Sequence, residues 1–234
     1  MIIDAHSHVH DPVESHLKLL DDAGVDRAVL FMTRPHPERA TDREFLRQEM
    51  SALDRAFSGH GSCGESYRAA WREFDDALAA YPERFIGFGS VPLDLSGEQI
   101  AAAVGRDVAG RGLPGIGELT PPPGQAARLG PVLEAAHDHG GLPVVVHGFA
   151  PTTAEDLRTF SRLAARHPKV PLIVSQLGGL NWMTAIDLAK DTPNIYLELS
   201  TASIVFAVKL AIRELPERTL FGSDAPYGDP VSPA

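Results

Sequence analysis

Two features of this 234-residue sequence predict an α/β fold, in which strands and helices alternate along a single domain. Eight short apolar runs recur along the chain, and several are continuous rather than alternating, as is typical of parallel strands buried on both faces. The segments between most of these runs carry apolar residues near helical spacing. Eight strands that alternate with helices favour a closed, TIM-like (β/α)8 barrel over an open sheet.

The predicted strands are short and occur along the whole chain. In order, they are Met1–Ala5, Arg27–Met32, Arg84–Ser90, Leu113–Leu119, Leu142–His147, Val170–Ser175, Asn194–Leu199 and Thr219–Ser223. The predicted helices are Asp11–Ala23, Ser66–Ala80, Ser96–Ala109, Ala126–His139, Thr153–Arg166, Asn181–Lys190 and Thr201–Glu214. This alternation implies right-handed crossover connections and therefore a parallel sheet.

One connection is much longer than the loops of an ordinary barrel. Thr33–Glu65 follows the second strand and is polar and rich in proline, glycine and arginine, with a helical piece near Arg43–Phe57. In a barrel, this insertion would lie over the C-terminal ends of the strands, where barrel enzymes place their active sites. Two alternatives stay open for it: a lid or substrate-binding loop, or an insertion without a functional role.

The end of the sequence also departs from a complete barrel, which needs about 250 residues. Only Ala225–Ala234, with three prolines, follows the eighth predicted strand, so no eighth helix is expected. A barrel without that helix exposes an apolar flank between its first and seventh helices. Either a partner chain covers this flank or the sequence is truncated, and we expect a homodimer or a higher homo-oligomer.

The composition argues against several classes of function. The chain carries 21 basic and 31 acidic residues, a formal charge of −10, and has no basic stripe that would bind nucleic acid. No apolar run approaches the roughly 18 residues that a membrane span needs. The N-terminus does not resemble a signal peptide, so we expect a cytoplasmic protein. Cys63, the single cysteine, is interpreted as an ordinary thiol because no nucleophile motif surrounds it.

Three histidines and an aspartate stand at the ends of predicted strands. His6 and His8 close the first strand, His147 ends the fifth, and Asp224 ends the eighth. Residues two apart on a strand point to the same side, so the first two imidazoles can converge at the barrel mouth. Each motif alone also fits a structural role such as a turn, but the four together predict a metal site. Three imidazoles and a carboxylate suit one divalent ion, with Zn²⁺ first and Mn²⁺ or Fe²⁺ as alternatives.

With these residues in place, the chain resembles a known family. The segments IDAHSH, YPERFIGFGSVPL, GIGEL, LPVVVH, NIYLELS and LFGSDAP are similar, as a set, to the amidohydrolase-2 branch of the amidohydrolase superfamily. The likeness covers nearly the whole chain, and the family includes hydrolases, lactonases and nonoxidative decarboxylases on (β/α)8 barrels. The resemblance implies that Asp224 receives a proton from a metal-bound water. It also implies the metal ligands His6, His8, His147 and Asp224.

The sixth predicted strand departs from the family pattern, which usually reads HLGG. This sequence reads SQLGG over residues 175–179, so Gln176 stands where the family has a histidine that contacts metal or substrate. A glutamine can form hydrogen bonds but cannot shuttle a proton near neutral pH. Three alternatives stay open: Gln176 orients a substrate carbonyl or carboxylate, the site is mononuclear and needs no histidine here, or the enzyme is impaired. The change argues against a two-metal centre.

Three further side chains are candidates for the site. Glu118 ends the fourth strand, and the resemblance suggests a carboxylate near the metal, as an extra ligand or a second base. The alternative for Glu118 is a structural carboxylate paired with an arginine. Arg34, after the second strand, could bind an anionic substrate bidentately or could be a solvated surface residue. Trp182 could line the substrate pocket or pack in the core.

These observations predict an amidohydrolase-type, metal-dependent hydrolase that cleaves an amide, ester or lactone bond of a small substrate. The metal lowers the pKa of a bound water and Asp224 acts as general base, with Gln176 and Glu118 completing the predicted catalytic set. The alternative is a nonoxidative decarboxylase, a lyase whose metal binds the carboxylate, and Gln176 counts against it because it cannot protonate carbon. A third alternative is a vestigial, non-catalytic barrel.

Overall fold

The computed structural model describes residues 1–57 and 64–231. Cys63, which the sequence analysis interprets as an ordinary thiol, lies outside the described residues. The strands are β1 (Ile3–His8), β2 (Arg27–Phe31), β3 (Phe85–Phe88), β4 (Ile116–Leu119), β5 (Val144–Val146), β6 (Leu172–Val174), β7 (Ile195–Glu198) and β8 (Thr219–Leu220). The α-helices are α1 (Val13–Asp22), α2 (Arg43–Phe57), α3 (Glu65–Ala80), α4 (Gly97–Ala103), α5 (Gly130–Asp138), α6 (Ala154–Arg166), α7 (Trp182–Asp191) and α8 (Val205–Glu214).

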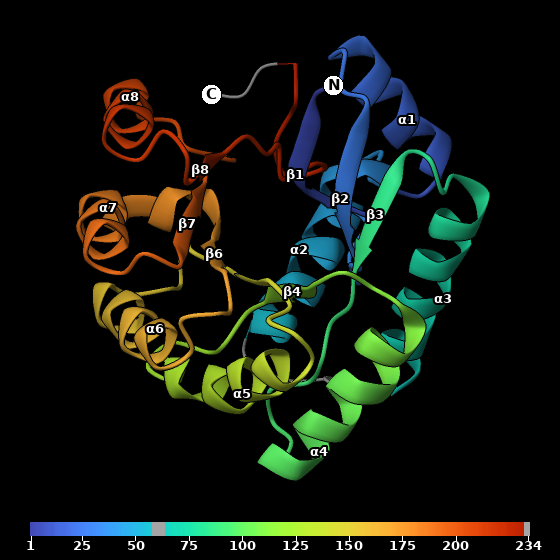
Figure 1. Cartoon of the computed structure of the whole chain (residues 1–234). Coiled ribbons are helices and arrows are strands. Elements are labelled where there is room, and N and C mark those ends of the chain that lie inside the picture. Colours follow the sequence, from blue (N-terminus) through green and yellow to red (C-terminus); the bar gives the residue numbers. More distant parts are fainter. Residues whose placement is uncertain (58–63, 232–234) are drawn as a thin grey trace.

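The strands form a ring of parallel neighbours in chain order, with helices outside, which confirms the predicted (β/α)8 fold (Figure 1). Strands β1–β3 form a three-stranded sheet and β4–β8 a five-stranded sheet. Two junctions join the sheets, which we call the β3–β4 seam and the β8–β1 seam. A parallel bridge links Gly89 to Ile116 at the first, and another links Ser7 to Ala225 at the second.

Several observed boundaries differ from the predicted ones, and three of the differences have a clear local reason. β1 extends to His8, because Ser7 and His8 still pair with β2. The helix expected at Ser96–Ala109 ends at Ala103 and continues as a π turn and a 3-10 turn, in a stretch whose two glycines have low helix propensity. The helix expected from Thr201 begins at Val205, because Thr201 adopts a left-handed backbone conformation with φ of 52°.

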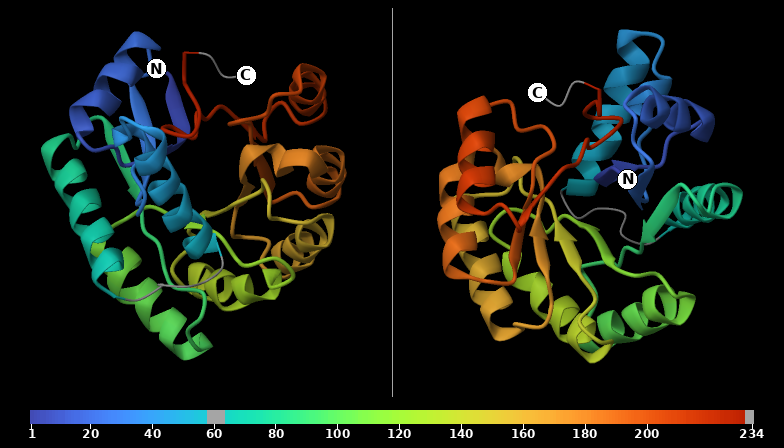
Figure 2. Two further views of the ribbon diagram at one scale, coloured as in Figure 1. Left: turned by 180° about the vertical axis from the view of Figure 1, so that it is seen from behind. Right: turned by 45° about the horizontal axis from the view of Figure 1, so that its top comes forward.

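The insertion after β2 carries the expected helix, α2, with the predicted bounds. Figure 2 shows α2 standing apart from the ring of outer helices, in front of the strands when the barrel is seen from behind. Met50 and Leu53 of α2 line the same pocket as residues from the C-terminal ends of β1, β4 and β8. The insertion therefore forms one side of the barrel mouth.

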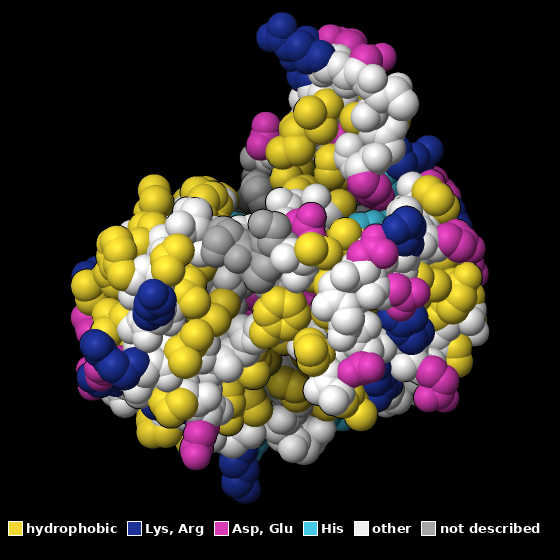
Figure 3. All heavy atoms as spheres, turned by 90° about the horizontal axis from the view of Figure 1, so that it is seen from above, with side chains coloured by type: hydrophobic (Ala, Val, Ile, Leu, Met, Phe, Trp, Pro, Cys, Tyr) yellow, Lys and Arg dark blue, Asp and Glu magenta, His cyan; other side chains and the backbone are white. Residues whose placement is uncertain are grey.

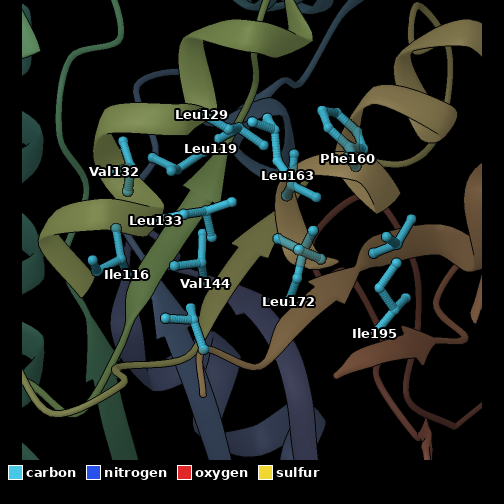
Figure 4. Packing of buried hydrophobic residues seen from close by; sticks show 14 of the residues in the cluster. Ile116, Leu119, Leu129, Val132, Leu133, Val144, Phe160, Leu163, Leu172 and Ile195 are labelled. Atoms are coloured by element: carbon cyan, nitrogen blue, oxygen red, sulfur yellow. The ribbon is translucent and has the colours of Figure 1, made fainter. Parts of the chain in front are cut away.

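Apolar packing holds the outer helices to the strands. The largest cluster lies between the five-stranded sheet and its helices, and Figure 4 shows the strand residues Ile116, Val144 and Leu172 facing Leu133 and Phe160 from the helices. A smaller cluster lies between β1–β3 and the helices α1 and α3. Val91 and Leu119 of the larger cluster also line the pocket at the barrel mouth, so apolar side chains continue from the core into its wall.

No helix follows β8 in the described part of the chain, as expected, and the flank between α1 and α8 is apolar. Ile3 of β1 is 41% exposed and Ile212 of α8 is 48% exposed. Figure 3 looks onto this flank and shows hydrophobic side chains in and beside a shallow hollow. Of the helices described, none is long and apolar enough to cross a lipid bilayer.

Candidate metal centre

β1 carries two buried imidazoles into the barrel mouth. His6 and His8 are two residues apart on the strand, and their Nε2 atoms lie 3.2 Å from each other. Asp224 lies across the β8–β1 seam, and its Oδ1 is 3.4 Å from His6 Nε2 and 3.2 Å from His8 Nε2. Ligand atoms about 2 Å from one ion lie at most about 4 Å apart, so a single metal ion fits this triangle.

Glu118, at the end of β4, brings a fourth donor group to the triangle. Its Oε1 lies 3.8 Å from His6 Nε2, and its Oε2 lies 3.9 Å from His8 Nε2. These separations are also compatible with coordination of one ion. Within the described residues, Glu118 pairs with histidines and with no arginine, which favours a place in the metal centre over a structural ion pair.

His147 follows β5 and lies beside Glu118, outside the triangle. Its Nδ1 is 3.2 Å from Glu118 Oε1, and its Nε2 is 3.2 Å from the carbonyl oxygen of Ala150. The structure thus brings together three of the four expected ligands directly. It places the fourth in contact with the centre through Glu118.

Glu198, at the end of β7, orients the ring of His6. It is fully buried, and its Oε2 lies 2.9 Å from His6 Nδ1, so the carboxylate favours the tautomer that leaves Nε2 available for a metal. Glu198 also accepts hydrogen bonds from Ser200 Oγ at 2.8 Å and from the Gln176 N–H at 3.2 Å. Sequence reasoning missed this residue. The available signal was a carboxylate inside the apolar run NIYLELS, because a buried charge requires partners.

Asp4 and Ser223 hold the backbone on both sides of the β8–β1 seam. The buried Asp4 Oδ1 accepts hydrogen bonds from the N–H groups of His6 at 3.0 Å and Ser223 at 2.9 Å. Its Oδ2 accepts one from Ser223 Oγ at 2.5 Å. Burial raises the pKa of Asp4 to about 6, although the hydrogen bonds from Ser223 and His6 lower it. This network fixes the position of Asp224 relative to the two histidines.

The charges around the triangle favour a cation. Burial lowers the pKa of His6, but Asp224 and Glu118 outweigh burial and raise it to about 10. Burial raises the pKa of Glu118, but His6 and His147 outweigh burial and bring it far below its usual range. The carboxylates therefore stabilise a positive charge at the imidazoles, and a divalent cation can replace the proton there. The donor set fits a bound metal.

Gln176 connects the two carboxylates of the centre. Its Nε2 donates hydrogen bonds to Glu118 Oε1 at 3.2 Å and to Asp224 Oδ2 at 3.1 Å. Its Oε1 accepts hydrogen bonds from the N–H groups of Gly148 at 2.9 Å and Phe149 at 3.2 Å. Both ends of the amide are engaged within the protein, which favours a positioning role over direct contact with a substrate.

Four non-glycine residues of the described chain adopt the left-handed backbone conformation. They are Gln176, Leu177, Thr201 and Asp224, with φ values of 52°, 53°, 52° and 58°. All four follow β6, β7 or β8 at the barrel mouth. Such conformations cost about 1–3 kcal/mol each and concentrate at functional sites, where the surrounding structure maintains them.

The candidate metal centre lies in a pocket of about 400 Å³ whose wall is largely apolar. Leu93, Phe149 and Met50 contribute apolar surface, and Arg34 also lines the wall. Burial lowers the pKa of the half-buried Arg34. Trp182 is not among the lining residues; it packs against the main core and forms an edge-to-face contact with Phe206, with ring centroids 5.8 Å apart.

Solved structures with a similar fold include metal enzymes of more than one activity. A 2,6-dihydroxybenzoate decarboxylase is similar with a TM-score of 0.61 and 16% identity, over 98% of this chain and 90% of that one. A 5-carboxyvanillate decarboxylase from Novosphingobium aromaticivorans, solved with manganese, has a TM-score of 0.57 and 18% identity, over 92% of this chain and 70% of that one. An amidohydrolase from Burkholderia multivorans with bound zinc has a TM-score of 0.58 and 14% identity, over 97% and 84%.

Sequence comparisons are more specific about the family than these distant structural neighbours, which share the fold alone. No curated protein matches the chain. A family model described as amidohydrolase matches residues 3–232, nearly the whole sequence. The matched region contains every residue of the centre, from the histidines of β1 to the aspartate after β8. The chain therefore belongs to the amidohydrolase family.

Proposed function

We propose that this protein is a hydrolase that uses one divalent metal ion to cleave an amide, ester or lactone bond of a small substrate. The observation that carries the proposal is the triangle of His6 Nε2, His8 Nε2 and Asp224 Oδ1, whose sides measure 3.2–3.4 Å. Glu118 would be a further ligand, and His147 would join the coordination or hold Glu118. Zinc is our first choice of metal, with Mn²⁺ or Fe²⁺ as alternatives.

The residues of the centre have distinct roles in this proposal. A bound divalent ion would lower the pKa of a water molecule and polarise a carbonyl group. Asp224 accepts the proton of the attacking water and returns it to the leaving group. Gln176 holds Asp224 Oδ2 by a 3.1 Å hydrogen bond, which leaves Oδ1 directed at the histidines. Glu198 keeps His6 in the tautomer that binds metal.

The pocket wall supports a small substrate with an apolar body and an anionic group. Phe149 and Leu93 provide apolar contact, and Arg34 provides a guanidinium group suited to bidentate binding of a carboxylate. Because Arg34 is partly desolvated, a hydrogen-bonded anion beside it is bound more strongly than at the open surface.

Nonoxidative decarboxylation is the second candidate, and one observation favours it. Two of the similar solved structures are decarboxylases that act on aromatic acids. The same metal would then bind a substrate carboxylate, and an acid would have to protonate carbon. Gln176 cannot supply that proton, and its hydrogen bonds to Glu118 and Asp224 are compatible with a role that does not involve one. Hydrolysis is therefore our primary proposal.

The first experiment is the metal content of the purified protein, measured by elemental mass spectrometry. We expect about one Zn or Mn per chain in the wild type. His6→Ala and Asp224→Ala should lose it, whereas His137→Ala, which removes an exposed histidine of α5, should retain it. A wild-type protein without metal, even after incubation with excess Zn²⁺ and Mn²⁺, would instead indicate a vestigial barrel.

The second experiment separates the two reactions on the metal-loaded protein. Panels of esters, lactones and amides are assayed for hydrolysis, and aromatic and unsaturated carboxylic acids are assayed for released CO2. Hydrolysis that disappears in Asp224→Asn supports the primary proposal. Release of CO2 without hydrolysis would overturn it in favour of the decarboxylase.

A further inference from the structure

The insertion after β2 forms one side of the substrate pocket, yet its helix is not held by the apolar core. α2 stands apart from the outer helices (Figure 2), and no side chain of residues 43–55 is buried, whereas the neighbouring helix α3 buries three. Of the described elements, α2 packs most closely against η1 (Pro37–Arg39), the short 3-10 helix that precedes it. Met50 and Leu53 of α2 line the pocket, so the contacts that fix α2 also determine the position of this wall.

His36, which immediately precedes η1, connects α2 to the rest of the barrel. Its backbone N–H donates a hydrogen bond of 2.7 Å to Glu49 Oε2 on α2. The residue is 5% exposed, and its ring places Nδ1 3.0 Å from Glu38 Oε1 and Nε2 3.1 Å from Glu73 Oε2 on α3. Glu38 Oε1 also accepts a hydrogen bond of 2.9 Å from the Asp11 N–H, in the loop after β1. A single histidine therefore links α2 to α3 and, through Glu38, to the loop after β1.

We propose that His36 is a positioning residue for the substrate pocket: its doubly protonated ring holds α2 at the barrel mouth, and loss of one proton from that ring loosens α2. The inference rests on the proposed function, because it assigns a form of regulation to that same pocket. It also gives the insertion a functional role, which is one of the two alternatives that the sequence leaves open.

The number of protons on the ring decides how many of these contacts it can make. A neutral imidazole has one N–H, whereas an imidazolium ring has two. Both ring nitrogens of His36 face carboxylates, so the neutral ring directs a lone pair at one of them. Burial lowers the pKa of His36, but the hydrogen bonds to Glu38 and Glu73 outweigh burial and raise it above its ordinary value. The charged form, with two donated hydrogen bonds, therefore persists to a higher pH than in a free histidine.

The other groups around His36 keep a constant charge where its ring titrates. Burial raises the pKa of Glu38, but the hydrogen bonds from His36 and from the Asp11 N–H outweigh burial and lower it, so Glu38 stays ionised. Burial lowers the pKa of the neighbouring His10 to about 4, so that ring is neutral near neutral pH. Arg39 pairs with Asp11 at 2.9 Å and stays charged throughout. Near neutral pH and just above it, the charge of this group of residues therefore changes at His36.

The test is hydrogen–deuterium exchange of the α2 amides, measured by mass spectrometry on the protein as purified, from about pH 6 to about pH 9. α5 in the same sample is the internal reference, because the intrinsic exchange rate rises equally with pH in both helices. Since the pKa of His36 is raised in the folded protein, its hold on α2 is complete below the ordinary pKa of histidine and is lost as the pH rises through the raised value. We expect α2 to exchange about tenfold faster relative to α5 at the high end, since one charged hydrogen bond contributes an effect of that order.

Variants assign this effect to the ring of His36. His36→Gln keeps the backbone N–H that donates to Glu49 but carries no charge, so its α2 should exchange about tenfold faster than the wild type near pH 6 and show no pH dependence beyond that of α5. Glu73→Gln removes one partner carboxylate and should lower the pH at which α2 loosens. His139→Gln and Glu83→Gln, which change exposed residues, are the matched controls and should behave as the wild type. Wild-type protection of α5 in each variant shows that the barrel is folded.

The link to the pocket is tested on the reaction itself. With a substrate found in the hydrolysis assays, His36→Gln should raise KM several-fold near pH 6 and leave kcat within a factor of about two, because α2 lines the wall and contributes no group to the metal centre. In the wild type KM should rise with pH as α2 loosens, and in His36→Gln this rise should be absent.

The outcomes separate this inference from the proposed function. Equal exchange of α2 in the wild type and in His36→Gln at every pH overturns the inference, and so does a pH dependence that survives in His36→Gln. A loosened α2 without a change in KM overturns the role of His36 in the pocket. None of these results alters the metal content or the reaction, whereas a protein without metal or hydrolysis overturns the proposed function, and the exchange measurement still decides whether His36 holds α2.

Discussion

The two seams of the barrel differ in the side chains that join them. At the β3–β4 seam backbone hydrogen bonds link Gly89 to Gly115 and Gly117, and the side-chain contacts are apolar. A Cβ atom at Gly115 would overlap the ring of Phe88, and one at Gly89 would meet Val108 and Leu113. At the β8–β1 seam the side-chain contacts are polar, and the buried carboxylate of Asp4 joins the two segments through hydrogen bonds.

This difference follows from the helical segments that cover each seam and from the functional side chains that lie at it. The β3–β4 seam lies against the helical segment after β3, whose Val104 and Val108 are fully buried. The β8–β1 seam has no helix of its own among the described residues, and it brings His6 and His8 next to Asp224. A polar junction keeps charged side chains in fixed positions, because each hydrogen bond has a preferred direction. Backbone hydrogen bonds cross both seams, and polar side chains are added at the seam that carries the candidate metal ligands.

Metal binding at the β8–β1 seam should produce the largest change in the free energy of unfolding. Zn²⁺ at a thousandfold excess over its Kd should raise the free energy of unfolding by about 4 kcal/mol, because the ion binds the folded chain. Differential scanning calorimetry with and without a chelator measures the shift. His8→Ala should abolish it, whereas Gly115→Ala, at the other seam, should retain it. A full shift in His8→Ala would place the metal elsewhere.

Removal of the Asp4 carboxylate at the β8–β1 seam should have the next largest effect on the free energy of unfolding. Asp4→Ala leaves the buried N–H groups of His6 and Ser223 without their acceptor and should cost about 3 kcal/mol. Urea denaturation of the metal-free protein measures the change. Asp138→Ala, which removes an exposed aspartate at the end of α5, is the control and should be nearly neutral. Equal stability of the two variants would contradict a structural role for Asp4.

Overpacking of the β3–β4 seam should destabilise the fold less than loss of the Asp4 carboxylate does. Gly115→Ala forces the buried Phe88 ring to move and should destabilise the fold by about 2 kcal/mol. Gly97→Ala is the matched control, since a Cβ there meets only Pro131 at ordinary contact distance. Metal affinity, measured by competition with a chromophoric chelator, should stay at the wild-type value in both variants. Loss of metal affinity in Gly115→Ala would show that the two seams are coupled.

The smallest effect should come from a single hydroxyl group at the polar seam. Ser223→Ala removes the 2.5 Å hydrogen bond to Asp4 Oδ2 but keeps the backbone N–H that donates to Oδ1. A loss of about 1 kcal/mol is expected. A double-mutant cycle with Asp4→Ala should show that the two changes are not additive. Strict additivity would mean that Ser223 and Asp4 stabilise the seam independently.

The strand runs and their order were sufficient to predict the barrel, because parallel strands buried on both faces need continuous apolar sequence. The pair His6 and His8 could be predicted as converging, since the twofold period of a strand is a local property. The position of Asp224 next to them followed from closure of the ring, which the number of strands already implied. The described residues after β8 form no helix, which agrees with the prolines at positions 226 and 230, since proline disfavours a helix interior.

The tertiary structure alone decided which carboxylates surround these histidines and which groups hold them. Glu118 rather than His147 approaches the triangle directly, Glu198 orients His6, Gln176 joins Glu118 to Asp224, and His36 joins the insertion to α3. These contacts join residues far apart in the chain, and they depend on side-chain rotamers and on strand-end conformations such as the left-handed backbone of Asp224. Sequence periodicity determines which face a side chain occupies, whereas contacts between loops depend on how all eight strand ends meet.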